Sequence, residues 1–328
     1  MDGLAQDSRA GNFASREASK AINSMRISMS TRGRIGGFLI LGLLGVCPLA
    51  HGSFSFGDAG SFAVLYGGAG SHKLQISDGA INGNIGLGDS GGPSLQARLN
   101  GPLTINGDIE FAGSVKDQIS PGVTVNGSIS ANNVTVQSDL NGLYSLSGAL
   151  GAETGTALAL NLVNGANQII NAANGILDGS GNRVFDLSSL RFANGATLTI
   201  SGSASDYVVF NMNANASFGG RIQLVGGLTS DRVLFNIIGG HTLDISANGA
   251  TLSGIFLDPN GAMSINHSVL DGRFFGGGNN DMQIGSGAYI YEPIITPEPT
   301  TLLTGVLLLL PFGASAVKGS KKLWKMAR

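Results

Sequence analysis

Apolar and polar residues alternate over short segments throughout the middle of the chain. Residues 103–111 read LTINGDIEF, and a similar segment, 123–130, reads VTVNGSIS. Because successive side chains of a strand point to opposite faces, this alternation predicts strands with one buried and one exposed face. We expect the following side chains to point inward: Ile105, Ile109, Phe111, Val123, Val125 and Ile129.

Two sequence patterns recur at nearly constant spacing. The unit [IV]-N-G-x-I begins at residues 81, 105 and 125, and DYVVFNM at 206–212 returns as DRVLFNI at 231–237. Similar strands at such intervals indicate coils that stack and bury each other's apolar edges. Asn-Gly pairs also fit the turns of a hairpin-rich β-sandwich. Because the strand pattern continues on both sides of Asn-Gly, we favour an all-β fold built as a β-helix, or β-solenoid, over residues 53–290.

One segment has a different period. Apolar residues in 154–173 follow the spacing of one helical face. Thr154 is placed to cap the start of a helix and Gly175 to end it. We therefore predict one α-helix packed along the flank of the solenoid. Its apolar face would comprise Leu158, Leu162, Val163, Ala166, Ile169, Ile170 and Ala173.

The N-terminal part of the chain has the pattern of a secretory signal. Residues 35–50 read IGGFLILGLLGVCPLA and directly follow the basic residues Arg32 and Arg34. A basic segment, a short apolar segment and small residues at a cleavage site are the three parts of a signal peptide. We expect cleavage after Gly52. The cleavage region comprises Ala50, Gly52 and Ser53.

Residues 1–24 form a polar extension that is unusually long for a leader. We expect translation to start at Met25 or Met29, so that the signal peptide spans residues 25–52. Cys47 is the only cysteine of the chain, which excludes disulfides and cysteine-based metal sites. A lipoprotein anchored through this cysteine is the weaker interpretation, because the residue before it is unsuited to lipidation.

The C-terminal part has three sections. A linker at 291–299 ends in the triplet Pro297, Glu298 and Pro299, an apolar run covers 300–317, and a basic tail covers 318–328. The apolar run is just long enough to cross a bilayer core of about 30 Å as a transmembrane helix. The basic tail should stay in the cytoplasm, which places the solenoid on the far side of the membrane.

This tripartite C-terminus resembles the PEP-CTERM sorting signal of Gram-negative bacteria. The resemblance implies export by the Sec machinery, transient membrane anchoring through the C-terminal helix, and processing near the Pro-Glu-Pro triplet by an exosortase. It also implies a location in the cell envelope, at the surface or in the extracellular matrix, in organisms that make exopolysaccharide.

The body resembles a second family, the choice-of-anchor A domain. The resemblance covers about 53–290 and is carried by GSFAVLYGG, VLFNI, LSGIFLDPNGAMSI and LDGRFFGG. More distantly, the body resembles ice-binding-like β-helical domains that have a flanking helix. Choice-of-anchor A domains occur with several kinds of surface anchor, which agrees with the C-terminal signal.

Charge separates the body from the two ends. Residues 53–296 hold eight basic and 17 acidic residues, a net charge of −9. Phosphate binding needs a basic face, so this body is not expected to bind nucleic acid. The 42% hydrophobic content with only 12% charged residues is sufficient for a folded core.

Three motifs suggest chemistry without completing it. GDSGGP at 88–93 matches a serine-protease nucleophile motif, but no histidine base stands in a matching motif, so we interpret it as a turn. Asp108 and Glu110 would share a strand face as a glycosidase pair does, without aromatic residues beside them to hold a sugar. Asp178, Ser180 and Asn182 begin like a calcium loop whose later ligands are missing. We predict no catalytic residue, no metal site and no cofactor.

Small polar residues at outward positions remain as a candidate binding surface. A regular file of hydroxyl and amide groups could bind ice or a polysaccharide, although such residues also suit any solvated strand. The candidate file comprises Thr104, Asn106, Thr124, Asn126, Thr199 and Ser201. A second such pattern places Thr135 and Gln137 outward on a strand.

Together these features predict an exported, exosortase-sorted surface or matrix protein. Its role would be structural or adhesive, with exopolysaccharide as the candidate partner. The alternative is an ice-binding, antifreeze-like protein. A polysaccharide-processing enzyme is the third and least favoured hypothesis.

Overall fold

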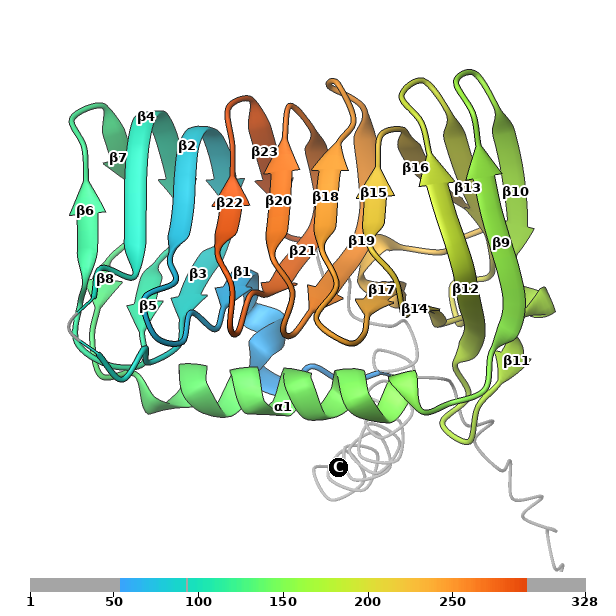
Figure 1. Cartoon of the computed structure of the whole chain (residues 1–328), viewed down its shortest axis with the longest axis horizontal. Helices are drawn as coiled ribbons and strands as arrows, with labels where there is room; N and C mark the ends of the chain where they lie inside the picture. Colours follow the sequence, from blue (N-terminus) through green and yellow to red (C-terminus); the bar gives the residue numbers. More distant parts are fainter. Residues whose placement is uncertain (1–53, 93, 294–328) are drawn as a thin grey trace, which may run out of the picture. The chain divides into compact units, whose positions relative to one another are not determined.

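The computed structural model describes residues 54–92 and 94–293, which form a β-solenoid with one long helix (Figure 1). The predicted fold class is therefore confirmed. The strands before the helix are β1 (Phe62–Tyr66), β2 (Leu74–Asn82), β3 (Asn84–Leu87), β4 (Ala97–Asn106), β5 (Ile109–Phe111), β6 (Asp117–Ile119), β7 (Val123–Val125) and β8 (Ile129–Ser130). The helix is α1 (Val134–Gly151).

The strands after the helix complete the solenoid. They are β9 (Thr156–Leu162), β10 (Asn167–Asn171), β11 (Ile176–Leu177), β12 (Arg183–Phe192), β13 (Thr197–Ser201), β14 (Val208–Met212), β15 (Ala216–Phe218), β16 (Arg221–Val225), β17 (Val233–Ile237), β18 (Leu243–Ser246), β19 (Thr251–Asp258), β20 (Met263–Asn266), β21 (Val269–Gly276), β22 (Met282–Ile284) and β23 (Ala288–Tyr291). Short 3-10 turns occur at η1 (Gly57–Ser61), η2 (Ala172–Asn174) and η3 (Ser230–Arg232).

The order of the coils in space differs from their order in the sequence. β1 to β8 run from the middle of the stack to one end, and α1 then carries the chain back along the whole stack (Figure 1). β9 to β23 return to the middle, where β21 pairs with β1 and both β22 and β23 pair with β2. The first and last coils of the described chain are therefore neighbours, joined by parallel strands about 200 residues apart in sequence, such as Val64 and Phe274.

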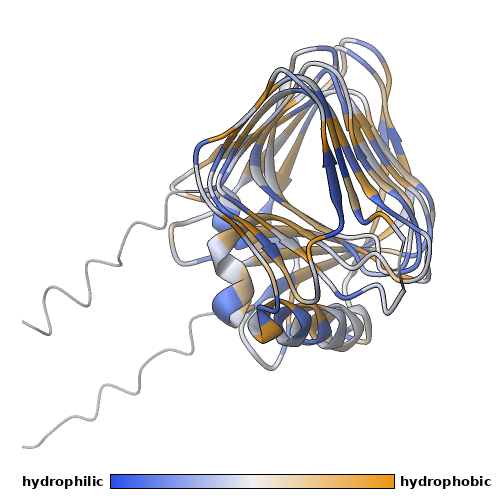
Figure 2. Cartoon of the chain, turned by 90° about the vertical axis from the view of Figure 1, so that its left-hand side faces the viewer, coloured by the Kyte–Doolittle hydropathy of each residue, from blue (hydrophilic) through white to orange (hydrophobic). Residues whose placement is uncertain are grey.

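Each coil contributes strands to three faces, and the coils seen end on have a triangular outline (Figure 2). The helix face carries α1 and contains β5, β3, β1, β17 and β14. The β22 face contains β6, β22, β20 and β18, and the β23 face contains β7 and β23. Long strands such as β2, β4, β19 and β21 bend from one face to the next.

The repeats found in the sequence stack in register, which confirms the prediction of stacked coils. Ile81 pairs with Ile105, and Ile105 pairs with Val125, as the recurring [IV]-N-G-x-I unit predicts. The second repeat aligns in the same way, because Asn211 on β14 lies beside Asn236 on β17. Identical side chains on neighbouring coils therefore contact each other.

A stack of aromatic rings fills the core of the second half. Phe185, Phe210, Phe235 and Phe256 lie on successive coils with ring centroids 5.2, 5.1 and 4.8 Å apart and planes within 19° of parallel. Phe218 meets Phe235 and Phe256 edge to face. Stacked and edge-to-face pairs of this kind add stabilisation beyond the burial of their area.

The helix lies at 134–151, so its predicted position at 154–173 is wrong. The predicted segment instead forms β9 and β10, in which Leu160 and Leu162 alternate inward while Ile169 is 72% exposed. The two-residue period of this segment was therefore the correct one. The observed helix begins at Asn133, whose side-chain oxygen accepts a hydrogen bond from the backbone N–H of Thr135 at 3.1 Å. Thr135 and Gln137 are consequently helical, not outward strand residues.

The helix covers the outer surface of the helix face, so the strands of this face are buried both toward the core and toward the helix. Val136, Leu140 and Leu143 of α1 pack in one cluster with outward residues of the helix face, among them Leu65 and Leu234. All five residues of β1, β14 and β17 are buried for this reason. The helix thus covers apolar surface that a bare solenoid would expose to water.

Two buried asparagines fix the C-terminal end of the helix to the sheet. Asn211 Nδ2 donates to the carbonyl of Leu150 at 2.8 Å, and Asn236 Nδ2 donates to the carbonyl of Ser147 at 3.0 Å. Asn236 Nδ2 also lies 2.9 Å from Asn211 Oδ1. Carbonyls in the last turn of a helix lack a regular partner four residues on, and the asparagine repeat gives this end of α1 additional donors from the sheet.

The predicted inward residues are confirmed except at the end of the stack. Ile105, Ile109 and Phe111 are buried. Val123 and Val125 are only partly buried, and Ile129 is 38% exposed although it is in register with the buried Ile109, because it lies on the last coil of this end. Within the part of the chain that the structure describes, β8 is bonded only to β5 and no further coil covers it.

The predicted signals lie outside the described residues. This applies to the extension at 1–24, the signal peptide at 25–52, the Pro-Glu-Pro triplet at 297–299 and the span at 300–317. Within 54–92 and 94–293 no helix is long and apolar enough to cross a membrane.

Candidate functional site

The candidate polar file lies on the β23 face, but its six residues do not come together. Thr104 and Thr124 are in register on β4 and β7. Thr199 and Ser201 lie on β13, in a separate three-stranded sheet of β10, β13 and β16. Between these two groups the face carries other residue types, so it offers no single continuous file of threonine and asparagine.

An asparagine ladder gives the first half of the β23 face its most regular feature. Asn106 Nδ2 donates to Asn82 Oδ1, and Asn126 Nδ2 donates to Asn106 Oδ1, each at 2.6 Å. Together with Thr104 and Thr124 these side chains form a polar patch across three coils. The ladder also holds the coils in register, so its residues have a structural role as well.

The middle of the β23 face carries two tyrosines that the sequence reasoning did not single out. Tyr289 and Tyr291 are 40% and 43% exposed, while Ala288 and Ile290 between and beside them are buried. The alternation in AYIY places both tyrosines on the outward face of a strand. Large aromatic side chains are unfavourable in water, so this pattern could have marked them as candidate binding residues. Their position beside β2 and β21 follows only from the fold.

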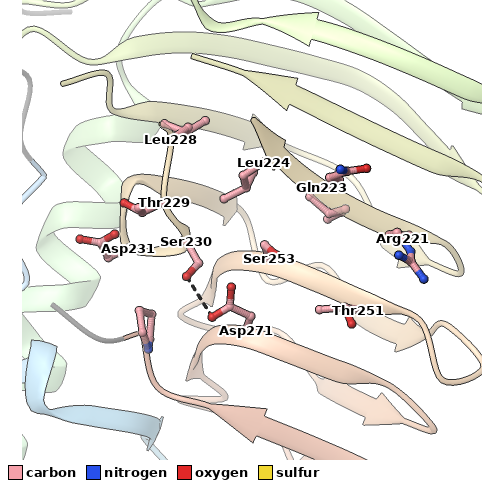
Figure 3. A pocket seen from close by; sticks show the side chains of 12 residues that line it. Arg221, Gln223, Leu224, Leu228, Thr229, Ser230, Asp231, Thr251, Ser253 and Asp271 are labelled. Atoms are coloured by element: carbon pink, nitrogen blue, oxygen red, sulfur yellow. Dashed lines mark hydrogen bonds between the residues drawn. The ribbon is translucent and has the colours of Figure 1, made fainter. Parts of the chain in front are cut away.

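A cavity of about 430 Å³ interrupts the β23 face where β16 and β19 lie side by side without pairing (Figure 3). Arg221, Gln223 and Leu224 line it from β16, and Thr251 and Ser253 from β19. Leu228, Thr229, Ser230 and Asp231 come from the loop before β17, Asp271 from β21 and Pro293 from the segment after β23. The cavity therefore combines apolar side chains with polar side chains of both charges.

Two serine hydroxyls hold Asp271 at this cavity. Its Oδ1 lies 3.1 Å from the hydroxyl of Ser230, as Figure 3 shows, and Ser253 also donates to it. Burial raises the pKa of this carboxyl. The two hydroxyls lower the pKa, and the negative charge of nearby Asp231 raises it further. The carboxylate is thus held in one orientation at the edge of the cavity.

The carboxylates proposed as a glycosidase pair are engaged in contacts between coils. Asp108 Oδ1 accepts hydrogen bonds from the backbone N–H and the hydroxyl of Ser128, at 2.7 and 2.8 Å. These bonds, led by the backbone N–H, lower the pKa of Asp108. Glu110 accepts a hydrogen bond from Asn133 at the start of α1. Both residues therefore hold neighbouring coils together.

The other two motifs are turns. Ser90 of GDSGGP bonds with Gly92 and accepts from the ammonium of Lys116 at 3.3 Å, so its hydroxyl has no histidine base. Asp178 accepts from the backbone N–H groups of Ser180 and Asn182, which closes the turn between β11 and β12. Among the residues that the structure describes, no group of three or more histidine, aspartate or glutamate side chains is placed to hold a metal ion.

Comparison with solved structures identifies the same fold elsewhere. An ice-binding protein from Shewanella frigidimarina superimposes with a TM-score of 0.51 at 13% identity, covering 74% of this chain and 98% of that one. An ice-binding protein from an Antarctic Flavobacteriaceae bacterium gives a TM-score of 0.50 at 17% identity, covering 74% of this chain and 48% of that one. Identities this low indicate a shared fold only.

Sequence comparison gives a more specific result. No curated protein matches the chain significantly. A family model described as an ice-binding-like adhesive domain matches residues 39–287, which is most of the chain and nearly the whole solenoid. The chain therefore belongs to the ice-binding-like adhesive domain family.

Proposed function

We propose that this protein is an exported adhesin of the cell surface or extracellular matrix, attached to its target through the β23 face. The observation that carries the proposal is the arrangement of this face. Polar groups on neighbouring coils are in register there, whereas α1 covers the helix face. Membership of an adhesive domain family supports the same role.

The competing β22 face is a less suitable attachment surface. Its outward row combines glutamine, arginine, serine and aspartate without a repeating group on adjacent coils, apart from one Gln-Gln pair. The row comprises Gln118, Arg98, Gln75, Gln283, Ser264 and Asp244. This face serves as the matched control for experiments on the β23 face.

Adhesion of cells that display the full chain tests the proposal. The triple variant Thr104→Lys, Asn106→Lys, Thr124→Lys should reduce attachment to matrix-coated surfaces at least tenfold, because charged side chains would disrupt the polar patch. The control variant Gln75→Lys, Gln118→Lys, Gln283→Lys adds the same charge to the β22 face and should attach normally. If the two variants attach equally well, the β23 face is not the attachment surface.

Export and sorting form a separate part of the proposal. The signal pattern at 25–52 and the Pro-Glu-Pro tail at 297–328 support delivery through the Sec machinery and an exosortase to the surface. Deletion of 297–328 should move the protein from the surface or matrix fraction to the periplasm or medium. Mass spectrometry of the mature wild-type protein should find cleavage after Gly52 and near Pro297. Unchanged location after the deletion would contradict this part.

Ice binding is the second candidate, and one observation favours it. Thr104 and Thr124 stand on adjacent coils, about 4.8 Å apart by the spacing of paired strands, and a regular threonine array is suited to an ordered water lattice. The array spans few coils, which is why we place adhesion first. Thermal hysteresis and recrystallisation assays on the full chain decide the question. Activity that Thr104→Lys abolishes would make ice the target.

A further inference from the structure

The two exposed tyrosines lie at the centre of the β23 face. Tyr289 and Tyr291 point outward from β23, and their backbones are about 7 Å apart because they stand two positions apart along the strand. β23 is paired on one side with β2 and on the other with β21, so both tyrosines lie where the first and last coils meet. Large aromatic side chains in such a position form a platform for a ligand with an apolar face.

Polar side chains extend from this platform toward the cavity. Tyr291 is in register with Asp271, which is in register with Ser253. Both Asp271 and Ser253 line the cavity, and Pro293, two residues after Tyr291, lines it as well. Two strand spacings, or about 10 Å, therefore separate the tyrosine from the cavity wall at Ser253. Platform and cavity form one continuous surface.

The groups around the cavity match hydroxyl groups better than a charged ligand. Asp271 accepts hydrogen bonds, Arg221 donates them, and the Gln223 amide and Ser253 hydroxyl can do both. Arg221 is outnumbered by Asp231 and Asp271, so the charged side chains of the lining sum to −1 and do not favour an anion. The acidic body, with a net charge of −9 over 53–296, also disfavours strongly acidic polymers.

We infer that Tyr289, Tyr291 and the adjoining cavity bind a neutral glycan, with sugar rings stacked on the tyrosines and sugar hydroxyls bonded to Asp271, Ser253 and Arg221. A pyranose ring has an apolar C–H face and a hydroxyl edge, and a site of this kind provides a partner for each. This inference rests on the proposed adhesive function and names its ligand class.

Binding of neutral hexasaccharides to the purified full chain tests the inference. Titration calorimetry with cellohexaose, laminarihexaose and maltohexaose should show saturable binding of at least one of them. The double variant Tyr289→Ala, Tyr291→Ala should weaken that binding at least tenfold. Tyr291→Phe keeps the aromatic ring and should retain most of the affinity. Asp271→Asn should weaken the binding less than the double variant does. Circular dichroism confirms that each variant is folded. Gln75→Ala with Gln283→Ala on the β22 face is the matched control.

The same variants in the cell adhesion assay separate this inference from the proposed function. Cells that adhere while no hexasaccharide binds at millimolar concentration would overturn the glycan site and leave the adhesin intact. Hexasaccharide binding that the double tyrosine variant retains would also overturn the site. In a third outcome, the hexasaccharide binds and the binding depends on Tyr289 and Tyr291, but cells do not adhere through the β23 face. This outcome would overturn the adhesive role and support the glycan site.

Discussion

The two halves of the solenoid keep their coils in register by different means. In the second half, β9 to β23, phenylalanine rings stack inside the core on four successive coils. In the first half, β1 to β8, the inward residues are mainly aliphatic, and asparagine side chains bond from coil to coil on the outside. The same coil geometry is thus held by buried aromatic contacts in one half and exposed hydrogen bonds in the other.

This difference has an energetic consequence. Buried aromatic side chains contribute several kilocalories per mole each, whereas an exposed hydrogen bond contributes about 1 kcal/mol because water competes for it. The second half should therefore provide most of the stability. The first half keeps polar side chains on its surface, and these form the most regular part of the β23 face.

The largest expected effect comes from removing one ring of the stack. Phe235 contacts Phe210, Phe218 and Phe256 at centroid distances of 5.1, 5.3 and 4.8 Å. Phe235→Ala should lower the free energy of unfolding by about 3–5 kcal/mol, because it leaves a cavity in the core. Urea denaturation measures the loss. Phe235→Leu, which keeps most of the volume, is the control, and a loss below 1 kcal/mol for Phe235→Ala would contradict the role of the stack.

The junction between the halves should give the next largest effect. Arg273 is only 2% exposed and donates both to the carbonyl of Gly60 and, at 3.1 Å, to Glu292 Oε1. Arg273→Met should cost about 2–3 kcal/mol, because it leaves a partly buried carbonyl and a half-buried carboxylate without their donor. Hydrogen exchange should rise first in β1 and β23. Uniform exchange rates across the chain would show that Arg273 does not join the halves through its bond to Gly60.

The pH dependence of stability should also differ between the halves. Asp258 on β19 is fully buried, and this burial raises its pKa to about 7, although the backbone N–H groups of Gly261 and Asn260 oppose the rise. The folded state then binds a proton that the unfolded state releases above about pH 4. Stability should therefore fall as pH rises from about 4 to 7 and stay level above that range.

Asp258→Asn removes this titration and isolates its contribution. We expect the variant to be about 1–2 kcal/mol more stable than the wild type at pH 8 and to lose part of the fall between pH 4 and 7. Thermal unfolding across this pH range measures both. Asp108 in the first half is the control, because its pKa is lowered and its contribution is lost only in acid. Parallel pH profiles for Asp258→Asn and the wild type would contradict the assignment.

The smallest effect is expected from the asparagine ladder. Asn106→Ala removes two exposed hydrogen bonds, to Asn82 and Asn126, and should cost about 1 kcal/mol or less. Asn126→Ala removes only one and should cost less again. Urea denaturation can resolve the order of the two variants. A loss for Asn106→Ala as large as that for Phe235→Ala would show that the two halves do not differ as described.

Local repetition allowed much of the fold to be predicted. The [IV]-N-G-x-I unit placed Ile81 beside Ile105, and the DYVVFNM repeat placed Asn211 beside Asn236. The helix was misplaced because 134–151 contains β-branched residues and two internal glycines, while leucines at 158 and 162 fit both a helix and a strand. Asn133 at the helix start was the local signal that the sequence reasoning did not use.

By itself the sequence determined the class of fold, the repeating coils and their inward residues, because each depends on neighbours within about one coil. Only the tertiary structure decided that β1 lies beside β21 and that β23 lies beside β2. These contacts join segments about 200 residues apart and have no local signal. The position of the tyrosine platform at the centre of the β23 face depends on the same long-range pairing, since β23 lies between β2 and β21 only when the last coil closes against the first.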